Sequence, residues 1–151
     1  MRTSICLALA LGWVLPAAGQ TVTVIDGDTL KYKGIVLHLW GVDAPELGQS
    51  CGDGWPAGQM AKLYLEGLVR GRTVTCDAKD TPQSKQSFAV CKVDGQDLGA
   101  AMASQGMAWA YPVQTQDYTV QDSNAMIAVL GVHAHDCIKA WEWRARNQRQ
   151  Q

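Results

Sequence analysis

The sequence predicts an α+β fold in which a small five-stranded sheet curls into an OB-type barrel, with about three helices. Three observations predict it: short β-branched runs separated by turn residues, one stretch of helical periodicity after the third run, and another after the fifth. A chain of 151 residues has the length of one domain, and its 47% of hydrophobic residues suffices for one compact core.

The first 19 residues have the pattern of a secretory signal peptide. Arg2 precedes an apolar run over 5–15 and small residues over 17–19, which predicts cleavage before Gln20. The apolar run is shorter than the roughly 20 residues of a membrane-spanning helix, so we expect no stable membrane anchor. We therefore expect residues 20–151 to form one exported domain, either periplasmic or secreted.

Strand signals dominate the first part of this domain. TVTVIDGDTLKYKG, residues 21–34, predicts a hairpin with its turn near Asp26 and Gly27. GIVLHLWGV, residues 34–42, predicts a third strand, and the fourth and fifth are expected at 73–76 and 87–93.

Helical signals follow the third and fifth strands. Apolar residues recur at helical spacing over 57–69, and Gly71 then ends the pattern. A second helix is expected between Asp97, as its N-cap, and Gly106. A weaker pattern predicts a third helix over 120–130, ending at Gly131.

The cysteines favour disulfides in an exported protein. Cleavage of the leader removes Cys6 and leaves Cys51, Cys76, Cys91 and Cys137, for which three pairings exist. Cys76 and Cys91 end two strand-like runs and would meet across neighbouring strands, leaving Cys51 to tie a loop to Cys137 in the tail. A zinc site is disfavoured because no close Cys-x-x-Cys pair is present.

Two acidic motifs carry the chemistry, IDGDT with Asp26 and Asp28 and VDAPE with Asp43 and Glu46. Each motif alone is more often a turn than a site. If the hairpin and third strand are neighbours, however, their ends bring the carboxylates together, and such a cluster needs a cation or a proton. Oxygen donors suit Ca²⁺ or Mg²⁺ better than Zn²⁺. The net charge of −1 provides no overall attraction for nucleic acid, so a polyanion would need a local cation or a bound metal.

Four segments in this order resemble the thermonuclease, or staphylococcal nuclease-like, family, especially its exported bacterial members. They are IDGDTLKYKG, VLHLWGVDAPE, GQDLGAAMASQGMAWAY and AWEWR, and together they cover essentially the whole domain. The resemblance implies an OB-type barrel, Ca²⁺ dependence, and hydrolysis of DNA or RNA phosphodiester bonds by an activated water.

The resemblance implies an intact metal half of the site. Asp28 and Asp43 match aspartates that bind Ca²⁺, and the backbone carbonyl of Ala44 would be a third ligand. Glu46 matches the glutamate that orients or deprotonates the attacking water, and Asp26 matches an aspartate near the metal.

The phosphate half departs from the family pattern. His38 and Gln86 stand at the two positions where the family has catalytic arginines. Such fixed cations stabilise charge on the phosphate, and loss of one preorganised donor typically costs ~100- to ~1000-fold in rate. Lys85 is a candidate substitute nucleotide-binding cation, as is a protonated His38. We favour the simpler interpretations, in which Lys85 is a solvated loop lysine and His38 packs beside Trp40.

Other departures leave alternatives open. Exported relatives commonly pair a cysteine at position 51 with one in a WPCG-like segment, which reads WPAG over 55–58 here. Pairing of Cys51 with Cys137 would compensate, and a free thiol is the alternative. Tyr111 lies near the position of a base-stacking aromatic and equally suits the rim of the core. The tail residues expected to pack back onto the barrel are Trp141, Trp143 and Arg144.

Three functions follow from these observations. The first is an exported thermonuclease-like protein with a Ca²⁺ site but weak or no cleavage, serving as a binding or accessory module. The second is an active Ca²⁺-dependent nuclease in which His38 or Lys85 replaces the arginines. The third is a purely structural interaction domain. The intact Asp28, Asp43 and Glu46 argue against the third, and the two lost arginines favour the first over the second.

Overall fold

A computed structural model describes residues 22–79 and 86–149 of the chain. The expected signal peptide and Lys85 lie outside these residues. Within the described ranges, no helix is long and apolar enough to cross a membrane.

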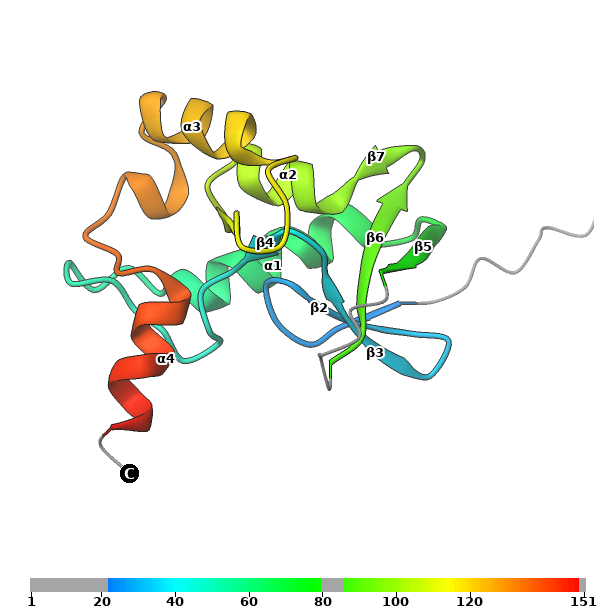
Figure 1. The fold of residues 1–151 in the computed structure, drawn as a ribbon, viewed down its shortest axis with the longest axis horizontal. Coiled ribbons are helices and arrows are strands. Elements are labelled where there is room, and N and C mark those ends of the chain that lie inside the picture. The colour runs from blue at the N-terminus through cyan, green and yellow to red at the C-terminus, as the bar shows by residue number, and fades with distance from the viewer. Residues whose placement is uncertain (1–21, 80–85, 150–151) are drawn as a thin grey trace, which may run out of the picture.

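Most strands belong to one sheet with the order β1-β2-β3-β6-β5, and β7 pairs with β6 (Figure 1). The first three strands form an antiparallel meander, and β3 continues into a parallel pairing with β6 that places His38 opposite Phe88. A separate two-stranded sheet pairs β4 with β8. The strands are β1 (Thr23–Val24), β2 (Thr29–Tyr32), β3 (Ile35–Leu39), β4 (Val42–Asp43), β5 (Val74–Lys79), β6 (Phe88–Val93), β7 (Gln96–Asp97) and β8 (Trp109–Ala110).

Within the described residues, four α-helices accompany the sheets. The helix α1 (Ala57–Val69) buries Ala61 and Leu65 in the main core, and α2 (Leu98–Ser104) buries Leu98 and Met102 there. In Figure 1, α3 lies beside α2, whereas α4 lies at the end of the molecule opposite β5 and β7. The remaining helical segments are α3 (Thr119–Ile127), α4 (Ala140–Gln148) and a 3₁₀ turn over Gly131–His133.

The predicted fold class is confirmed, and the bounds of α1 match the predicted 57–69. The Asp97 side chain caps α2 by accepting a 3.0 Å hydrogen bond from the backbone N–H of Ala100. The third strand was predicted too long, because the chain turns at Gly41 and starts β4. The third helix ends at Ile127, earlier than predicted, and α4 was not predicted. The fourth strand continues to Lys79, beyond the predicted end at 76.

Both expected disulfides are present. Cys76 and Cys91 are cross-strand partners on β5 and β6, and their bond links residues 15 apart. Cys51 bonds to Cys137 across a sequence separation of 86 and ties the loop after the DAPE motif to the tail. The alternative of a free thiol at position 51 is therefore wrong.

A small second core places α4. Trp109, Val132 and Ala140 are buried together, and Trp55, Cys137 and Trp141 pack against them. The Trp141 ring lies 6.3 Å from Trp109 and 5.5 Å from Tyr111, measured between ring centroids. The start of α4 is thereby held beside β8 and the loop that follows it.

Gly58 provides a close approach between α1 and the acidic loop. A Cβ atom at Gly58 would clash with the backbone carbonyl of Glu46, whereas a Cβ at Gly67 on the same helix would meet open space. The backbone N–H of Gly58 also donates to the carbonyl of Gln49 at 3.1 Å. The helix start and the Glu46 loop are therefore packed backbone to backbone.

This contact predicts opposite effects for two glycine substitutions in α1. Gly58→Ala must displace the Glu46 loop, and we expect a loss of about 1–3 kcal/mol in the free energy of unfolding. Gly67→Ala should stabilise the protein by about 0.4–1 kcal/mol by restricting the unfolded chain. Urea denaturation of both variants measures this, and equal effects of the two substitutions would contradict the close approach.

Candidate functional site

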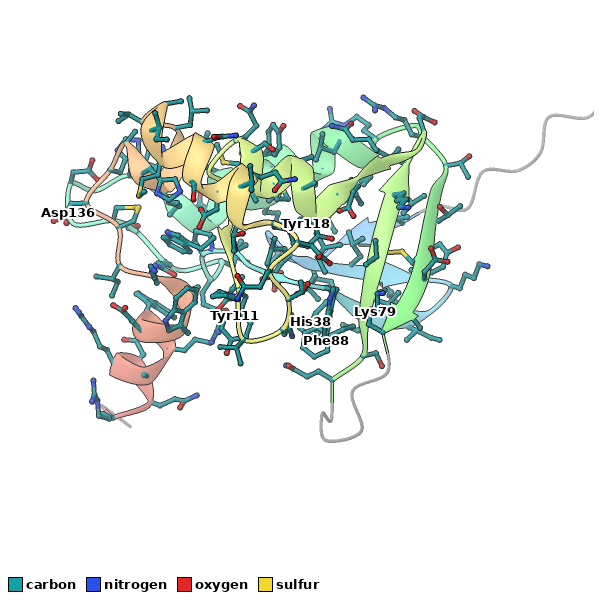
Figure 2. All side chains as sticks on the ribbon, turned by 45° about the horizontal axis from the view of Figure 1, so that its top comes forward. His38, Lys79, Phe88, Tyr111, Tyr118 and Asp136 are labelled. Atoms are coloured by element: carbon teal, nitrogen blue, oxygen red, sulfur yellow. A yellow bond between two sulfur atoms is a disulfide. The ribbon has the colours of Figure 1, made fainter. Side chains whose placement is uncertain are left out.

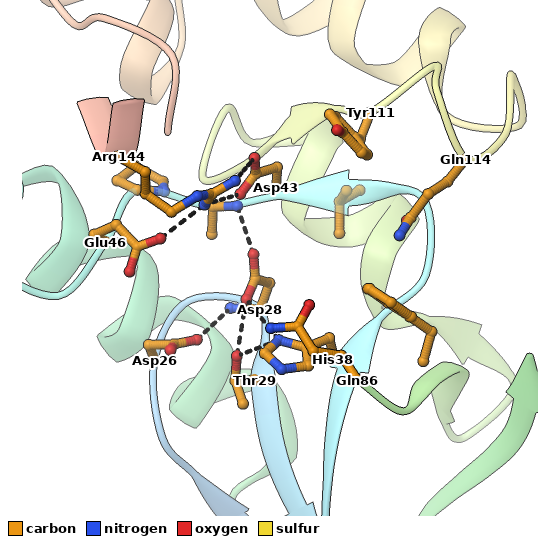
Figure 3. A pocket seen from close by; sticks show the side chains of 14 residues that line it. Asp26, Asp28, Thr29, His38, Asp43, Glu46, Gln86, Tyr111, Gln114 and Arg144 are labelled. Carbon is orange, nitrogen blue, oxygen red and sulfur yellow. Dashed lines mark hydrogen bonds and ion pairs between the residues drawn. The ribbon is translucent and has the colours of Figure 1, made fainter. Parts of the chain in front are cut away.

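One cavity of about 680 Å³ contains nearly all the described residues that were predicted to form the site. Four acidic residues line it, together with one arginine and one histidine (Figure 3). The residues lining the cavity are Asp26, Asp28, Thr29, His38, Val42, Asp43, Ala44, Pro45, Glu46, Gln86, Phe88, Tyr111, Gln114 and Arg144.

Asp28 joins the hairpin to the strand that carries the DAPE motif. Its Oδ2 accepts a 2.8 Å hydrogen bond from the backbone N–H of Ala44, and its Oδ1 accepts one of 2.9 Å from the Thr29 hydroxyl. The Asp28 side chain is 17% exposed. Burial raises the pKa of the Asp28 carboxyl, and the nearby charges of Asp26 and Asp43 raise it further.

His38 belongs to the same hydrogen-bonded group. Its Nδ1 lies 3.0 Å from the Thr29 hydroxyl and 3.9 Å from Oδ1 of Asp28. Because the Thr29 proton is used toward Asp28, the Nδ1 atom of His38 is the donor to the Thr29 oxygen. Figure 2 shows the His38 ring beside Phe88, with ring centroids 5.6 Å apart. The ring thus packs on Phe88 rather than on Trp40, and it takes part in the site.

Asp43 and Glu46 are bridged by one arginine. Nη1 of Arg144 donates to Oδ1 of Asp43 at 2.9 Å and to Oε1 of Glu46 at 2.7 Å, while Nη2 donates to Oδ2 of Asp43 at 2.7 Å (Figure 3). The Asp43 side chain is 9% exposed and that of Arg144 is 39% exposed. Hydrogen bonds to Asp43 and Glu46 raise the pKa of Arg144, so the guanidinium stays charged.

Arg144 was not predicted to belong to the site. Sequence reasoning assigned it, with Trp141 and Trp143, to packing of the tail. Trp141 does pack there, and residues three positions apart share one face of a helix, so the same anchor brings Arg144 to the pocket. The sequence held one signal for this contact: the acidic cluster has few cations near it in the sequence, and AWEWR contains an arginine that could supply one.

Gln49 is a buried residue that positions the Glu46 loop and that the sequence did not reveal. It is 1% exposed, its Oε1 accepts from the backbone N–H of Glu46 at 3.2 Å, and its Nε2 donates to the carbonyl of Ile138 at 2.8 Å. The backbone N–H of Gly52 donates to the backbone carbonyl of Asp136 nearby. These bonds fix the Glu46 loop against the segment that leads into α4.

Uncharged residues line the far wall of the pocket. Gln86 stands at one position where an arginine was expected, and it lines the cavity with His38. The backbone N–H of Tyr111 donates to the Gly41 carbonyl at 2.8 Å, and the Gln114 side chain accepts from the Gly41 N–H at 2.8 Å. The Tyr111 ring therefore stands at the pocket rim, in contact with Trp141.

The acidic residues offer donors that suit a hard cation, but their arrangement does not form a metal cage. Within 22–79 and 86–149, no group of three or more acidic, histidine or cysteine side chains is placed to hold a metal ion. Arg144 uses both oxygens of Asp43, and both oxygens of Asp28 already accept hydrogen bonds from Thr29 and Ala44. The observed arrangement is therefore a carboxylate–guanidinium site, and a divalent cation would require a rearrangement.

The fold and the site together are typical of one class of protein. OB-type barrels commonly bind oligonucleotides or oligosaccharides on one face, and here an acidic pocket with an arginine lies at the ends of the strands. Residues 36–150 match the family described as staphylococcal nuclease homologue. The chain belongs to this family, and the resemblance noted from its motifs is confirmed.

Three curated proteins are similar to this chain. The chain is 31% identical over 137 residues to an "Uncharacterized endonuclease" of Haemophilus influenzae, which covers 85% of this chain and 74% of that protein. It is 27% identical to a "Micrococcal nuclease" of Shigella flexneri, over 83% of this chain and 79% of that protein. It is 33% identical to "Protein ParB" of Escherichia coli, over 62% of this chain and 56% of that protein.

The His38 contacts predict a pH dependence. The Asp28 carboxylate raises the pKa of His38 above its ordinary 6.5. Protonated His38 therefore stabilises the folded state fully below pH 6.5, and this contribution is lost as the pH rises through the raised pKa. An NMR titration in EDTA should place the His38 midpoint above 6.5 and find it lower in Asp28→Asn. An unchanged midpoint in that variant would contradict the assigned coupling.

Proposed function

We propose that this protein is an exported member of the staphylococcal nuclease family that binds nucleic acid at the acidic pocket and cleaves it weakly or not at all. The observation that carries the proposal is the composition of the pocket. Asp28, Asp43 and Glu46 line it, while His38 and Gln86 stand where the family pattern has arginines. The protein then serves as a binding or accessory module.

The charges in the pocket support weak or absent cleavage. Phosphodiester hydrolysis builds negative charge on the phosphate, which a preorganised cation must stabilise. Gln86 carries no charge, and the Nδ1 atom of His38 is used in the contact to Thr29. The guanidinium of Arg144 lines the pocket, but three of its hydrogen bonds go to carboxylates. None of these three residues is a bidentate phosphate clamp as arranged.

We also propose Ca²⁺ as the cation that this protein binds, with Asp28, Asp43 and the Ala44 carbonyl as its ligands. Oxygen-only donors support this choice. Export through a signal peptide over 1–19 is part of the same proposal, and the two disulfides support it because such bonds persist in oxidising compartments.

Cleavage of single-stranded DNA by protein beginning at Gln20 tests the activity, measured with Ca²⁺ and with EDTA beside a Glu46→Gln variant. We expect little or no cleavage, with binding of the oligonucleotide retained in fluorescence anisotropy. Efficient cleavage that needs both Ca²⁺ and Glu46 would instead establish an active nuclease with substitute cations, and His38 and Lys85 would be the first candidates. Absence of both binding and cleavage would reject the nucleic-acid proposal.

Restoring the missing cations gives a complementary prediction. The double change His38→Arg with Gln86→Arg places two guanidinium groups on the wall of the pocket, and we expect cleavage to rise by ~100-fold or more over the parent protein. Lysine at both positions provides the matched control, because it adds the same charge without the bidentate geometry. Equal rates for the arginine, lysine and parent proteins would show that charge on this wall does not limit the reaction.

A further inference from the structure

We infer that Arg144 is a built-in cation that competes with divalent metal ions for Asp43 and Glu46, and so keeps the pocket in a low-affinity state. The inference rests on the Ca²⁺ site of the proposed function and adds a restraint that lies outside the two substituted arginine positions. Two observations lead to it. The carboxylate oxygens of the pocket suit Ca²⁺, but the guanidinium of Arg144 already contacts them.

The competition concerns particular oxygen atoms. Oδ1 and Oδ2 of Asp43 and Oε1 of Glu46 all accept from Arg144, over distances of 2.7–2.9 Å. A divalent cation bound to Asp43 needs lone pairs on the same carboxylate, and it would be repelled by a guanidinium a few ångströms away. Metal binding at Asp43 is therefore favoured when Arg144 withdraws from this carboxylate.

The contact also affects Glu46. Its Oε1 accepts a hydrogen bond from Nη1 of Arg144, so one of its two carboxylate oxygens is already directed toward the guanidinium. A withdrawn Arg144 would free Asp43 for a metal and Glu46 for chemistry together. One side chain thus controls both halves of the acidic site.

The surroundings of Arg144 allow such a withdrawal. The start of α4 is fixed, because Ala140 is fully buried and Cys137 is bonded to Cys51. The Arg144 side chain itself is 39% exposed and Glu46 is 34% exposed, so the guanidinium has a solvent-accessible side. The helix can stay in place while the arginine side chain changes rotamer.

The experiment measures Ca²⁺ binding by isothermal titration calorimetry, with Ca²⁺ alone as the ligand and protein beginning at Gln20. We expect Arg144→Gln to bind Ca²⁺ about tenfold or more tightly than the parent protein, because a positive charge beside the site is removed. Saturating Ca²⁺ should also raise the melting temperature of Arg144→Gln more than that of the parent protein.

Arg146→Gln is the matched control. Arg146 lies on the same helix, is exposed and does not line the pocket, so the variant makes the same change in net charge elsewhere. It should bind Ca²⁺ as the parent protein does, and Arg144→Lys, which keeps the charge, should fall between parent and Arg144→Gln. Near-ultraviolet circular dichroism of each variant without Ca²⁺ checks that the fold is retained.

Three results would overturn the inference: unchanged or weaker Ca²⁺ binding in Arg144→Gln, an equal gain in Arg146→Gln, or no Ca²⁺ binding by any of the proteins. Oligonucleotide binding, measured both with Ca²⁺ and in EDTA, separates these failures from failure of the proposed function. Parent protein that binds the oligonucleotide while Arg144→Gln gains no Ca²⁺ affinity would reject the competition alone. Loss of oligonucleotide binding in all proteins would reject the nucleic-acid function.

Discussion

The pairing of one guanidinium with two carboxylates is the interaction around which the pocket is organised. Four acidic side chains share a partly buried cavity, where like charges repel strongly unless a cation is close. Arg144 supplies that cation through a bidentate contact to Asp43 and a further bond to Glu46. The second core around Trp109 and the buried Gln49 both serve to keep the two sides of this contact together.

His38, Gln86 and Arg144 belong to the same pocket. His38 and Gln86 line one wall of the pocket, and Arg144 lies with Asp43 and Glu46 on the acidic side. Among the described residues that line the pocket, the arginine therefore lies beside the carboxylates. A guanidinium whose hydrogen bonds go to carboxylates is less available to an anion in the same pocket.

Local patterns in the sequence were sufficient for much of this structure. Helical periodicity and a following glycine located α1, the Asp97 cap located α2, and cross-strand neighbours located the bond between Cys76 and Cys91. The acidic residues were correctly expected in one place because short connections join the strands that carry them. Each of these features depends on residues close in sequence or on adjacent strands.

Features that depend on distant residues were missed. The strand β4 is only two residues long and exists through its pairing with β8, far along the chain. Apart from Ala145, the residues over 144–149 are charged or polar, so α4 lacks a continuous apolar stripe and its pattern did not predict a helix. Arg144 meets Asp43 across a separation of 101 residues, and no local signal indicates such a contact.

The bond between Cys51 and Cys137 shortens the covalent path between Asp43 and Arg144. The disulfide replaces the 101-residue path between Asp43 and Arg144 by two short segments, 43–51 and 137–144. Since loop-closure entropy grows with the length of the loop, the arginine meets the carboxylates at a far higher effective concentration than an unlinked tail would provide. An ion pair between opposite ends of the domain therefore behaves, in entropic terms, as a local contact for as long as the disulfide is intact.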